Sequence, residues 1–328
     1  QGGSASFDRS RSYIDEVSSF PENTNIRAML TFRSGQRGAI LSVPDGRYIP
    51  VTIHYTLAQL PERPMERRVA DDRVGNFMTV HKDFSAEDST FFRRYVNRWR
   101  LEPGERVGDL RRPVEPITYY IDRTVPDEYR GWFKEAVENW NTAFEAAGWV
   151  DAIRALDLPE DADPNDIRYS VLRWNTSDDP GYGAIGPSKV DPRTGEILDA
   201  DILFEANGFR SFRNTWRNIV NPVTAAEAFE MALGVGEFQD PDWGIPGVEL
   251  PGFASALEAQ GALAGLLLAA RGELDPGDPL PNELLRQYTI WLVMHEVGHT
   301  LGLRHNFRSS ASTPMDQLHN ADFTGANG

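Results

Sequence analysis

Residues 288–306 (YTIWLVMHEVGHTLGLRHN) constrain this chain more than any other stretch, because an apolar run there holds a fixed set of polar residues. His295, Glu296 and His299 stand within it in the spacing HExxH. Residues four apart project from one face of a helix, so both imidazoles can reach a single metal ion. The stretch therefore predicts a buried helix that carries two metal ligands.

A third ligand is expected just after this helix. Gly302 lies three residues beyond His299, and a residue without a Cβ can take the left-handed conformation that ends a helix. The resulting turn would bring back His305, which we interpret as the third ligand in preference to Asp316 or Asp322. Three neutral nitrogens leave the fourth position of a tetrahedral Zn2+ open, which is typical of a catalytic site rather than a structural one.

Glu296 directly follows the first predicted ligand. Its carboxylate is therefore expected beside the metal, within hydrogen-bonding reach of a water molecule there, without acting as a ligand. This is the position of a general base. The motif thus predicts one catalytic Zn2+, held by His295, His299 and His305, and hydrolysis that uses Glu296 as the base.

The stretch HEVGHTLGLRHNF resembles the zinc signature of the metzincin clan of metallopeptidases. More narrowly, it is similar to large bacterial zinc-dependent metalloproteases that have an N-terminal domain of uncharacterised function. The resemblance implies a zinc-dependent metalloendopeptidase that acts on protein or peptide substrates in the periplasm or outside the cell. It also implies a methionine turn after the third histidine. Met315 is the only methionine after His305, and the narrower family would place this turn beyond residue 328.

Composition excludes several classes of function. A net charge of −16 argues against nucleic acid or an anionic membrane as partner, since both require a basic face. The chain has no cysteine, so neither a disulfide framework nor a cysteine that blocks the metal is available. The longest uncharged apolar run, residues 261–270, is about half the length of a membrane-spanning helix, and we expect none. Because the chain begins at Gln1, we expect an upstream segment to have been removed.

We expect an α+β fold with a β-rich N-terminal domain. Residues 1–25 are polar and lack periodicity, which predicts a loose N-terminal arm. The following domain, residues 26–112, is expected to contain an antiparallel unit, because short segments alternate apolar and polar residues; these segments are residues 26–32, 38–43 and 48–57. Residues 102–113 combine proline, glycine and charge, which is typical of a linker. Whether this domain is a propeptide or presents substrate is left open.

Residues 113–328 are expected to form the metzincin-like domain, a twisted mixed sheet with a backing helix and the zinc-site helix. Strands are predicted at residues 116–122, 167–174 and 197–205. A helix is predicted from Tyr129 to a stop at Gly148, since apolar residues recur there every three or four positions. Further helices are expected at residues 224–233 and 253–270, and Asn282 is expected to cap the zinc-site helix. The resemblance implies that the C-terminal subdomain is lacking, so a C-terminal fragment of the same precursor is an expected partner.

Substrate is expected to bind along one short strand. In a metzincin the strand before the last one forms the upper rim of the cleft, where an extended peptide pairs with it by β-augmentation. By this resemblance Gly183, Ala184 and Ile185 are the candidate substrate-binding residues, and a simple glycine loop between strands is the alternative. Asp199 and Asp201 are candidate Ca2+ ligands, although their spacing gives no ordered cage of oxygens.

A second function remains open at this point. A zinc-containing, non-catalytic module for peptide binding or adhesion would keep the same metal-binding scaffold. The intact Glu296 argues against this alternative, because a purely structural site has no use for a base beside an open position.

Overall fold

The computed structural model of the 328-residue chain describes residues 5–34, 43, 45–85, 87, 90–177, 182–220, 271–272, 280–306, 313–318 and 320–327. The chain divides into two compact units. The first unit comprises Gln1–Pro64 and Pro159–Ser170, and the second comprises Met65–Leu158 and Val171–Gly328. A β-rich N-terminal region is followed by mixed strands and helices, which confirms the predicted α+β class.

The first unit contains a four-stranded antiparallel sheet. Its long central strand pairs with all the others, and β4 runs beside it from Tyr48↔Arg33 to Ala58↔Asn23. The strands are β1 (Ala5–Phe7), β2 (Tyr13–Ser19), β3 (Asn23–Ser34) and β4 (Tyr48–Ala58). β3 and β4 confirm the strands predicted at residues 26–32 and 48–57. The predicted strand at residues 38–43 falls, apart from Val43, outside the described residues.

The prediction of a loose arm at residues 1–25 is wrong for residues 5–25, the part that the structure describes. β1 and β2 both pair with β3, and a short 3-10 helix, η1 (Arg9–Arg11), joins them. Six of the seven residues of β2 are exposed, so no apolar alternation marks it in the sequence. Backbone pairing with β3, rather than burial of side chains, holds this segment.

A second segment of the first unit comes from the middle of the chain. Asn23 and Asn25, both buried in β3, donate side-chain amide hydrogen bonds to the carbonyl oxygen of Asn165, at 3.0 Å and 2.8 Å. The backbone N–H of Ile167 donates to the Asn23 side chain. Buried amides must be hydrogen-bonded, and these two find their partners in residues 159–170.

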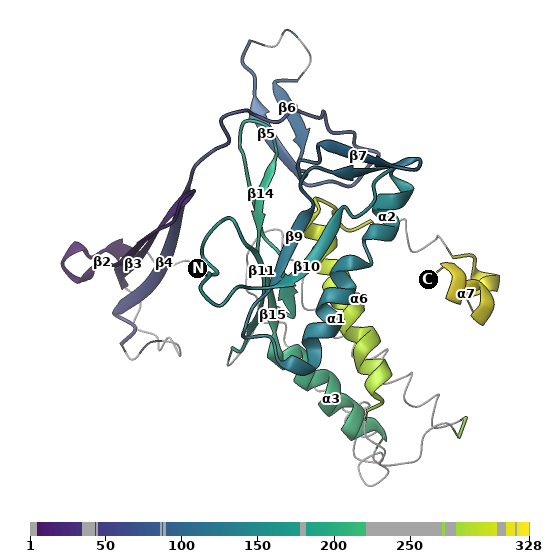
Figure 1. The fold of residues 1–328 in the computed structure, drawn as a ribbon. Helices are drawn as coiled ribbons and strands as arrows, with labels where there is room; N and C mark the ends of the chain where they lie inside the picture. The colour runs from purple at the N-terminus through teal and green to yellow at the C-terminus, as the bar shows by residue number, and fades with distance from the viewer. Residues whose placement is uncertain are drawn as a thin grey trace. The chain divides into compact units, whose positions relative to one another are not determined.

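The second unit is built on a five-stranded mixed sheet in the order β10-β9-β11-β15-β12. β9 pairs in parallel with β10, and β11 in parallel with β15, whereas β12 is antiparallel to β15 and ends the sheet. The strands are β9 (Ile117–Ile121), β10 (Ile153–Asp157), β11 (Ser170–Asn175), β12 (Ala184–Ile185) and β15 (Ile202–Glu205). Figure 1 shows the sheet and the helices that pack on it.

The single strand predicted at residues 197–205 is in fact two strands. β14 (Ile197–Ala200) pairs with β13 (Ser188–Val190) in a separate two-stranded sheet, while β15 joins the main sheet. The chain changes sheets at Asp201, whose carboxylate accepts a hydrogen bond from the backbone N–H of Val171. A period-two pattern runs through both strands, so the sequence alone does not reveal the break.

The helix predicted from Tyr129 to Gly148 is likewise divided, into α1 (Asp127–Glu138) and α2 (Asn141–Ala146). Asn141 explains the break, because its side chain hydrogen-bonds the backbone of Ala152 and Ile153 at the start of β10. Gly148, at φ +93°, ends α2 as predicted. Its positive φ is one that residues with a Cβ rarely adopt.

Two more helices complete the part of this unit that frames the site. α3 (Ala206–Val220) follows β15, and α6 (Asn282–Thr300) is the predicted metal-binding helix. α6 begins after Pro281 without a side-chain cap, so Asn282 is its first residue rather than its cap. The helices predicted at residues 224–233 and 253–270 lie outside the described residues. Two short elements follow near the end of the chain, η3 (Met315–Gln317) and α7 (Ala321–Asn327).

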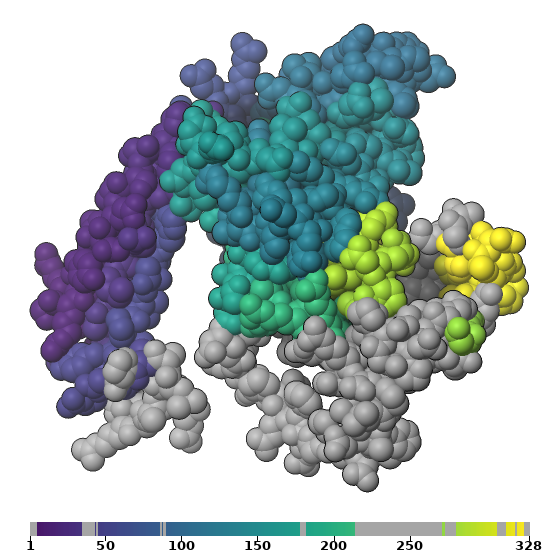
Figure 2. Space-filling model, turned by 60° about the horizontal axis from the view of Figure 1, so that its bottom comes forward, coloured from purple at the N-terminus to yellow at the C-terminus, as the bar shows by residue number. Residues whose placement is uncertain are grey.

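The core of the second unit lies between the sheet and the pair α1 and α6, which lie side by side (Figure 1). It is filled by fully buried side chains from four elements: Tyr119 of β9, Phe133 of α1, Phe204 of β15, and Val293 and Val297 of α6. Part of α6 also reaches the surface, as the light-green atoms of Figure 2 show. The metal-binding helix is thus fixed along its length by apolar packing. In the part of the chain that the structure describes, no helix is long and apolar enough to cross a bilayer.

The predicted linker at residues 102–113 is instead a hairpin of β7 (Pro103–Val107) and β8 (Leu110–Pro113). Gly108 supplies the turn at φ +61°. A second hairpin, β5 (Met78–Lys82) with β6 (Phe92–Val96), precedes it. Both hairpins belong to the second compact unit, which begins at Met65. The predicted domain boundary near residue 112 therefore does not coincide with the division into compact units, and that assignment of domains stays a prediction.

Candidate metal centre

Three histidines converge at the end of α6. The Nε2 atoms of His295, His299 and His305 form a triangle, and each pair of these atoms is 3.1 Å apart. Among the described residues, these three histidines are the group of side chains that lie close enough together to bind one metal ion. Asp316 and Asp322, the other candidates for third ligand, are not part of that group. The structure thus brings together the three predicted ligands.

The triangle has the dimensions that zinc requires. Nitrogens 3.1 Å apart could all bind one ion at the usual Zn–N distance of about 2.0–2.1 Å, and three such ligands would leave the fourth tetrahedral position open. The three rings are inclined to one another, by 88° between His295 and His299, 62° between His299 and His305, and 42° between His295 and His305. Their lone pairs therefore point toward one place from three directions, which fits Zn2+.

The hydrogen bonding of His299 favours the ligand form of its ring. Its Nδ1 lies 2.8 Å from the carbonyl oxygen of Leu303. A carbonyl oxygen can only accept, so Nδ1 carries the proton and Nε2 keeps its lone pair. Burial and the neighbouring His299 and His305 lower the pKa of His295 to about 4, and burial lowers the pKa of His305 as well. Both rings are therefore neutral at pH 7, as metal ligands must be.

The turn between the second and third histidines is a Schellman motif. The N–H of Gly302 donates to the carbonyl of His299, and the N–H of Leu303 donates to the carbonyl of Gly298. Gly302 itself has φ +99°, the left-handed conformation typical of the residue after a helix end. This turn reverses the chain within a few residues and brings His305 opposite α6.

A segment from far upstream fixes this turn. The backbone N–H of Phe77 donates to the carbonyl of Gly302 (2.8 Å), and the N–H of Arg304 donates to the carbonyl of Gly75 (2.9 Å). The ring of Phe77 also meets the His299 ring edge-on, with centroids 5.9 Å apart. Residues 75–77 thus pair with residues 302–304 as a short β-bridge on either side of the third ligand's turn.

The end of β6 and the residues that follow it form a second support, here called the strap (residues 96–99). The strap runs past two glycines that both have positive φ, Gly195 at +80° and Gly302 at +99°. A Cβ on Gly195 would lie 2.7 Å from the Val96 carbonyl oxygen, and a Cβ on Gly302 would overlap the Asn97 carbonyl oxygen. The strap can approach this closely only because neither residue has a side chain.

Glu296 lies on α6 between the first two histidines and is 7% exposed. Among the described residues nothing hydrogen-bonds its carboxylate, and burial alone raises its pKa to about 7. A cation at the three nitrogens would lower this pKa again, because it favours the carboxylate. Glu296 thus has a buried, unpaired carboxylate on the helix that carries two of the three histidines, and its role as general base stays a prediction.

Hydrogen bonds from aromatic residues anchor α6 near the site. Trp140 Nε1 donates to the carbonyl of Met294, and Trp99 Nε1 donates to the carbonyl of Thr300. The Tyr119 hydroxyl lies 2.7 Å from Thr300 Oγ1 in the buried core. The two tryptophan bonds tie the backbone of α6 to neighbouring elements, and the Thr300 carbonyl is one of the last four of the helix, which have no partner within it.

The Tyr119 contact makes the stability of the unit sensitive to alkaline pH. Burial raises the pKa of Tyr119 well above its usual value, whereas the tyrosine of an unfolded chain ionises near about 10. The stabilising effect is therefore complete below pH 10 and is lost as the pH rises above it, because only the unfolded chain releases the proton. We expect the free energy of unfolding to fall more steeply between pH 9 and 11 in the wild type than in Tyr119→Phe, measured by chemical denaturation.

A measurement at pH 7 provides the control for this prediction. There Tyr119→Phe should cost only the lost hydrogen bond to Thr300, about 1 kcal/mol. Equal slopes for the two proteins above pH 9 would show that Tyr119 does not ionise on unfolding.

β12 forms an edge of the main sheet beside α6. The N–H of Glu205 donates to the carbonyl of Gly183, so the backbone groups of Gly183 face β15. In an antiparallel pair these directions alternate, and the N–H and C=O of Ala184 therefore point to the open edge. The Ala184 side chain is buried and that of Ile185 is 38% exposed. Of the predicted rim residues, Ala184 and Ile185 form the edge strand β12 and Gly183 directly precedes it, and their role in substrate binding stays a prediction.

The carboxylates suggested for calcium already have a cationic partner. Lys189 Nζ contacts the carboxylate of the buried residue Asp199. The same Nζ atom lies 3.4 Å from the carboxylate of Asp201. An ammonium group beside both carboxylates offsets the charge that Ca2+ would neutralise. Calcium binding at this place stays a prediction.

Met315 is exposed rather than buried under a metal site. It begins η3, and its side chain is 82% exposed. The methionine turn implied by the resemblance is therefore not supplied by Met315.

Comparison with known families agrees with this geometry. Residues 277–328 match the family model described as Met-zincin. Residues 1–104 match a model described as a domain of unknown function (DUF5117). No curated protein and no solved structure matches the chain. The Met-zincin match and the three converging histidines support a zinc metalloprotease-like module, as the motif predicts.

The DUF5117 match also covers the residues that support the metal site and that sequence reasoning missed. Gly75, Phe77 and Asn97 contact the turn at Gly302, and all three lie within residues 1–104. No local pattern marks them, because their partners lie about two hundred residues away. The positive φ of Gly302 is, by contrast, indicated by the glycine within the motif itself.

Proposed function

We propose that this chain is a zinc-dependent metalloendopeptidase. The observation that carries the proposal is the triangle of Nε2 atoms of His295, His299 and His305, each pair 3.1 Å apart, next to a buried and unpaired Glu296. A set of three histidine ligands would leave a coordination position open, and Glu296 is the candidate base for it. A structural zinc site requires neither feature.

The metal ion, Glu296 and His299 have separate roles in the proposed hydrolysis. When bound, Zn2+ supplies a Lewis acid that polarises the peptide carbonyl and lowers the pKa of water. Glu296 takes a proton from the attacking water molecule as the oxygen adds to the carbonyl carbon, and delivers it to the leaving nitrogen as the C–N bond breaks. His299 is held for its role by the bond from Nδ1 to the Leu303 carbonyl, which fixes the orientation of its ring.

The edge of β12 provides a place for an extended substrate. A peptide can add to an open sheet edge through backbone hydrogen bonds, and the N–H and C=O of Ala184 point in that direction. In this proposal Gly183 and Ile185 flank the contact, and Ile185 presents its side chain to the substrate. We further propose that a C-terminal fragment of the same precursor completes the cleft and that the enzyme works outside the cytoplasm.

Zinc removal tests the proposal. We expect the purified chain to bind one zinc ion, to cleave casein, to lose cleavage after dialysis against a chelator and to regain it when zinc is returned. Because an ion that binds only the folded state stabilises it, the chelated protein should also melt at a lower temperature. Zinc content by elemental analysis, casein fragments by mass spectrometry and thermal unfolding are the three measurements.

The outcomes separate the alternatives. A chain that binds no zinc would contradict the assignment of the metal centre. Zinc bound without cleavage, even after addition of the expected C-terminal fragment, would favour the non-catalytic peptide-binding or adhesion module.

A further inference from the structure

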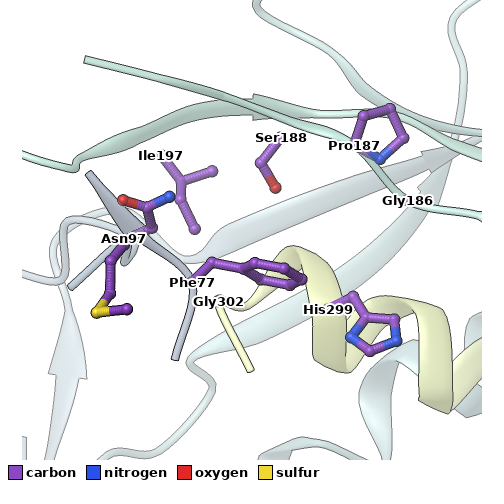
Figure 3. Close-up of a pocket in the computed structure, with 9 residues that line it drawn as sticks. Phe77, Asn97, Gly186, Pro187, Ser188, Ile197, His299 and Gly302 are labelled. Carbon is purple, nitrogen blue, oxygen red and sulfur yellow. The ribbon is translucent and has the colours of Figure 1, made fainter. Parts of the chain in front are cut away.

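A cavity of about 220 Å3 lies directly beside His299 (Figure 3). The ring of Phe77 lies at its centre in the view, next to His299, with Ser188 and Pro187 across from it. We call this cavity the Phe77 pocket. Its other main walls are Met78 of β5 and Ile197 of β14.

The walls of the Phe77 pocket are held in place by the backbone. Phe77 donates its N–H to Gly302 and accepts from the N–H of Asn97 at 2.9 Å. Its ring is nevertheless 42% exposed. A large apolar side chain that is held rigidly and left open beside a metal site is typical of a binding surface rather than of a core.

Gly186 sets the opposite wall. A Cβ at this position would lie 2.9 Å from Thr300 Cγ2 and 3.3 Å from the Glu296 carbonyl oxygen, both on α6. The absence of a side chain therefore lets the chain pass close to the metal-binding helix immediately after β12. Pro187 and Ser188 are placed over the cavity as a result.

We propose that the Phe77 pocket binds the side chain of a substrate residue on the amino-terminal side of the scissile bond, and that it selects an uncharged, apolar side chain. The proposal rests on the proposed function and identifies the substrate preference of that site. It assigns specificity to residues of the upstream hairpin, which the metal-binding motif does not contain.

The side of the scissile bond follows from the direction of β12 for a substrate that adds antiparallel to it, which is the orientation this proposal takes. A strand added antiparallel to β12 runs opposite to it, so the amino-terminal half of the substrate lies beside the residues that follow Ile185. Gly186, Pro187 and Ser188 are these residues, and all three line the pocket. The carboxyl-terminal half of the substrate would lie beside Gly183 instead.

Size and polarity give the class of side chain. Pockets for whole small molecules measure about 300–1000 Å3, so 220 Å3 suits one side chain of a longer ligand. Among the described residues that line it, none carries a carboxylate, an ammonium or a guanidinium group. A charged side chain would lose hydration there without gaining an opposite charge.

Cleavage profiling with two reciprocal variants tests the proposal. Wild type, Phe77→Ala and Ser188→Phe, all loaded with zinc, are incubated with a peptide library, and the cut sites are read by mass spectrometry. Phe77→Ala enlarges the pocket and should shift the preference on the amino-terminal side toward larger apolar residues. Ser188→Phe fills it and should shift the preference toward Gly and Ala, each by about tenfold in relative kcat/KM. General destabilisation of the protein cannot shift the substrate preferences of the two variants in opposite directions.

Phe84→Ala is the matched control. Phe84 lies beyond β5 in the same hairpin, is 81% exposed and does not line the pocket, so its removal should leave the profile unchanged. A second readout is independent of turnover: zinc-loaded Glu296→Gln should bind the best-cleaved peptide at least about tenfold more tightly than the same peptide with Asp at the pocket position.

The results distinguish this proposal from the proposed function. If wild type cleaves the library with no apolar preference on the amino-terminal side, or if neither pocket variant changes that preference, the pocket assignment is wrong and the peptidase stands. If zinc-loaded wild type cleaves nothing, the proposed function fails, and the pocket assignment fails with it.

Discussion

Glu296→Gln is expected to lower casein cleavage by about 10²–10⁴-fold while the zinc content stays the same. The amide has nearly the same shape as the carboxylate but cannot accept a proton. None of the three histidines changes, and among the described residues no hydrogen bond to the Glu296 carboxylate is lost. Zinc content and initial cleavage rates, measured on the same preparations, check both parts of the expectation.

Glu283→Gln is the control for this result. Glu283 lies in the exposed first turn of the same helix and pairs with Arg286, so the same chemical change there should leave cleavage intact. His299→Ala should lose zinc and cleavage together, since it removes a ligand. Full turnover in Glu296→Gln would assign the base to another residue, and loss of zinc in that variant would make Glu296 part of the scaffold.

The metal centre could be predicted from the sequence because it is almost entirely local. His295, Glu296 and His299 share one helix, and the geometry of a helix places them without any tertiary information. Gly302 and His305 follow within one turn of chain, and the requirement for a positive φ is visible in the glycine. The α+β class follows from the alternation of strand and helix patterns in the same way.

The supports of the site could not be predicted, since they depend on distant contacts. Phe77 meets Gly302 across more than two hundred residues, and nothing near residue 77 indicates that partner. The divisions within residues 129–147 and 197–205 have the same origin. The side chain of Asn141 and the carboxylate of Asp201 hydrogen-bond neighbouring strands, and this tertiary bonding overrides a continuous local pattern.

Part of the N-terminal region packs against the metal centre. Residues 65–112 belong to the same compact unit as α6, and residues 75–77 are paired with the turn that carries the third ligand. A removable propeptide would leave this turn without partners on that side. The contacts therefore argue that the β5–β6 segment is a permanent part of the metal centre.

Gly302→Ala tests this dependence and should destabilise the second unit strongly. An alanine there incurs two costs: a left-handed conformation, about 1–2 kcal/mol, and the displacement of the Asn97 carbonyl that its Cβ would overlap, about 1–3 kcal/mol more. Because the same turn positions His305, zinc affinity should fall as well. Chemical denaturation and zinc titration measure the two effects.

Gly148→Ala incurs only the first of these costs, so comparison with it isolates the second. Gly148 has φ +93°, close to the +99° of Gly302, but a Cβ there meets nothing within 4 Å. The free energy of unfolding of Gly148→Ala should therefore fall only by the cost of the left-handed conformation, about 1–2 kcal/mol. This variant should still bind zinc. The difference between the two variants measures how much the close approach of the strap contributes to the metal centre. Equal losses of stability, with zinc affinity unchanged in both, would show that the turn holds His305 without help from the upstream segment.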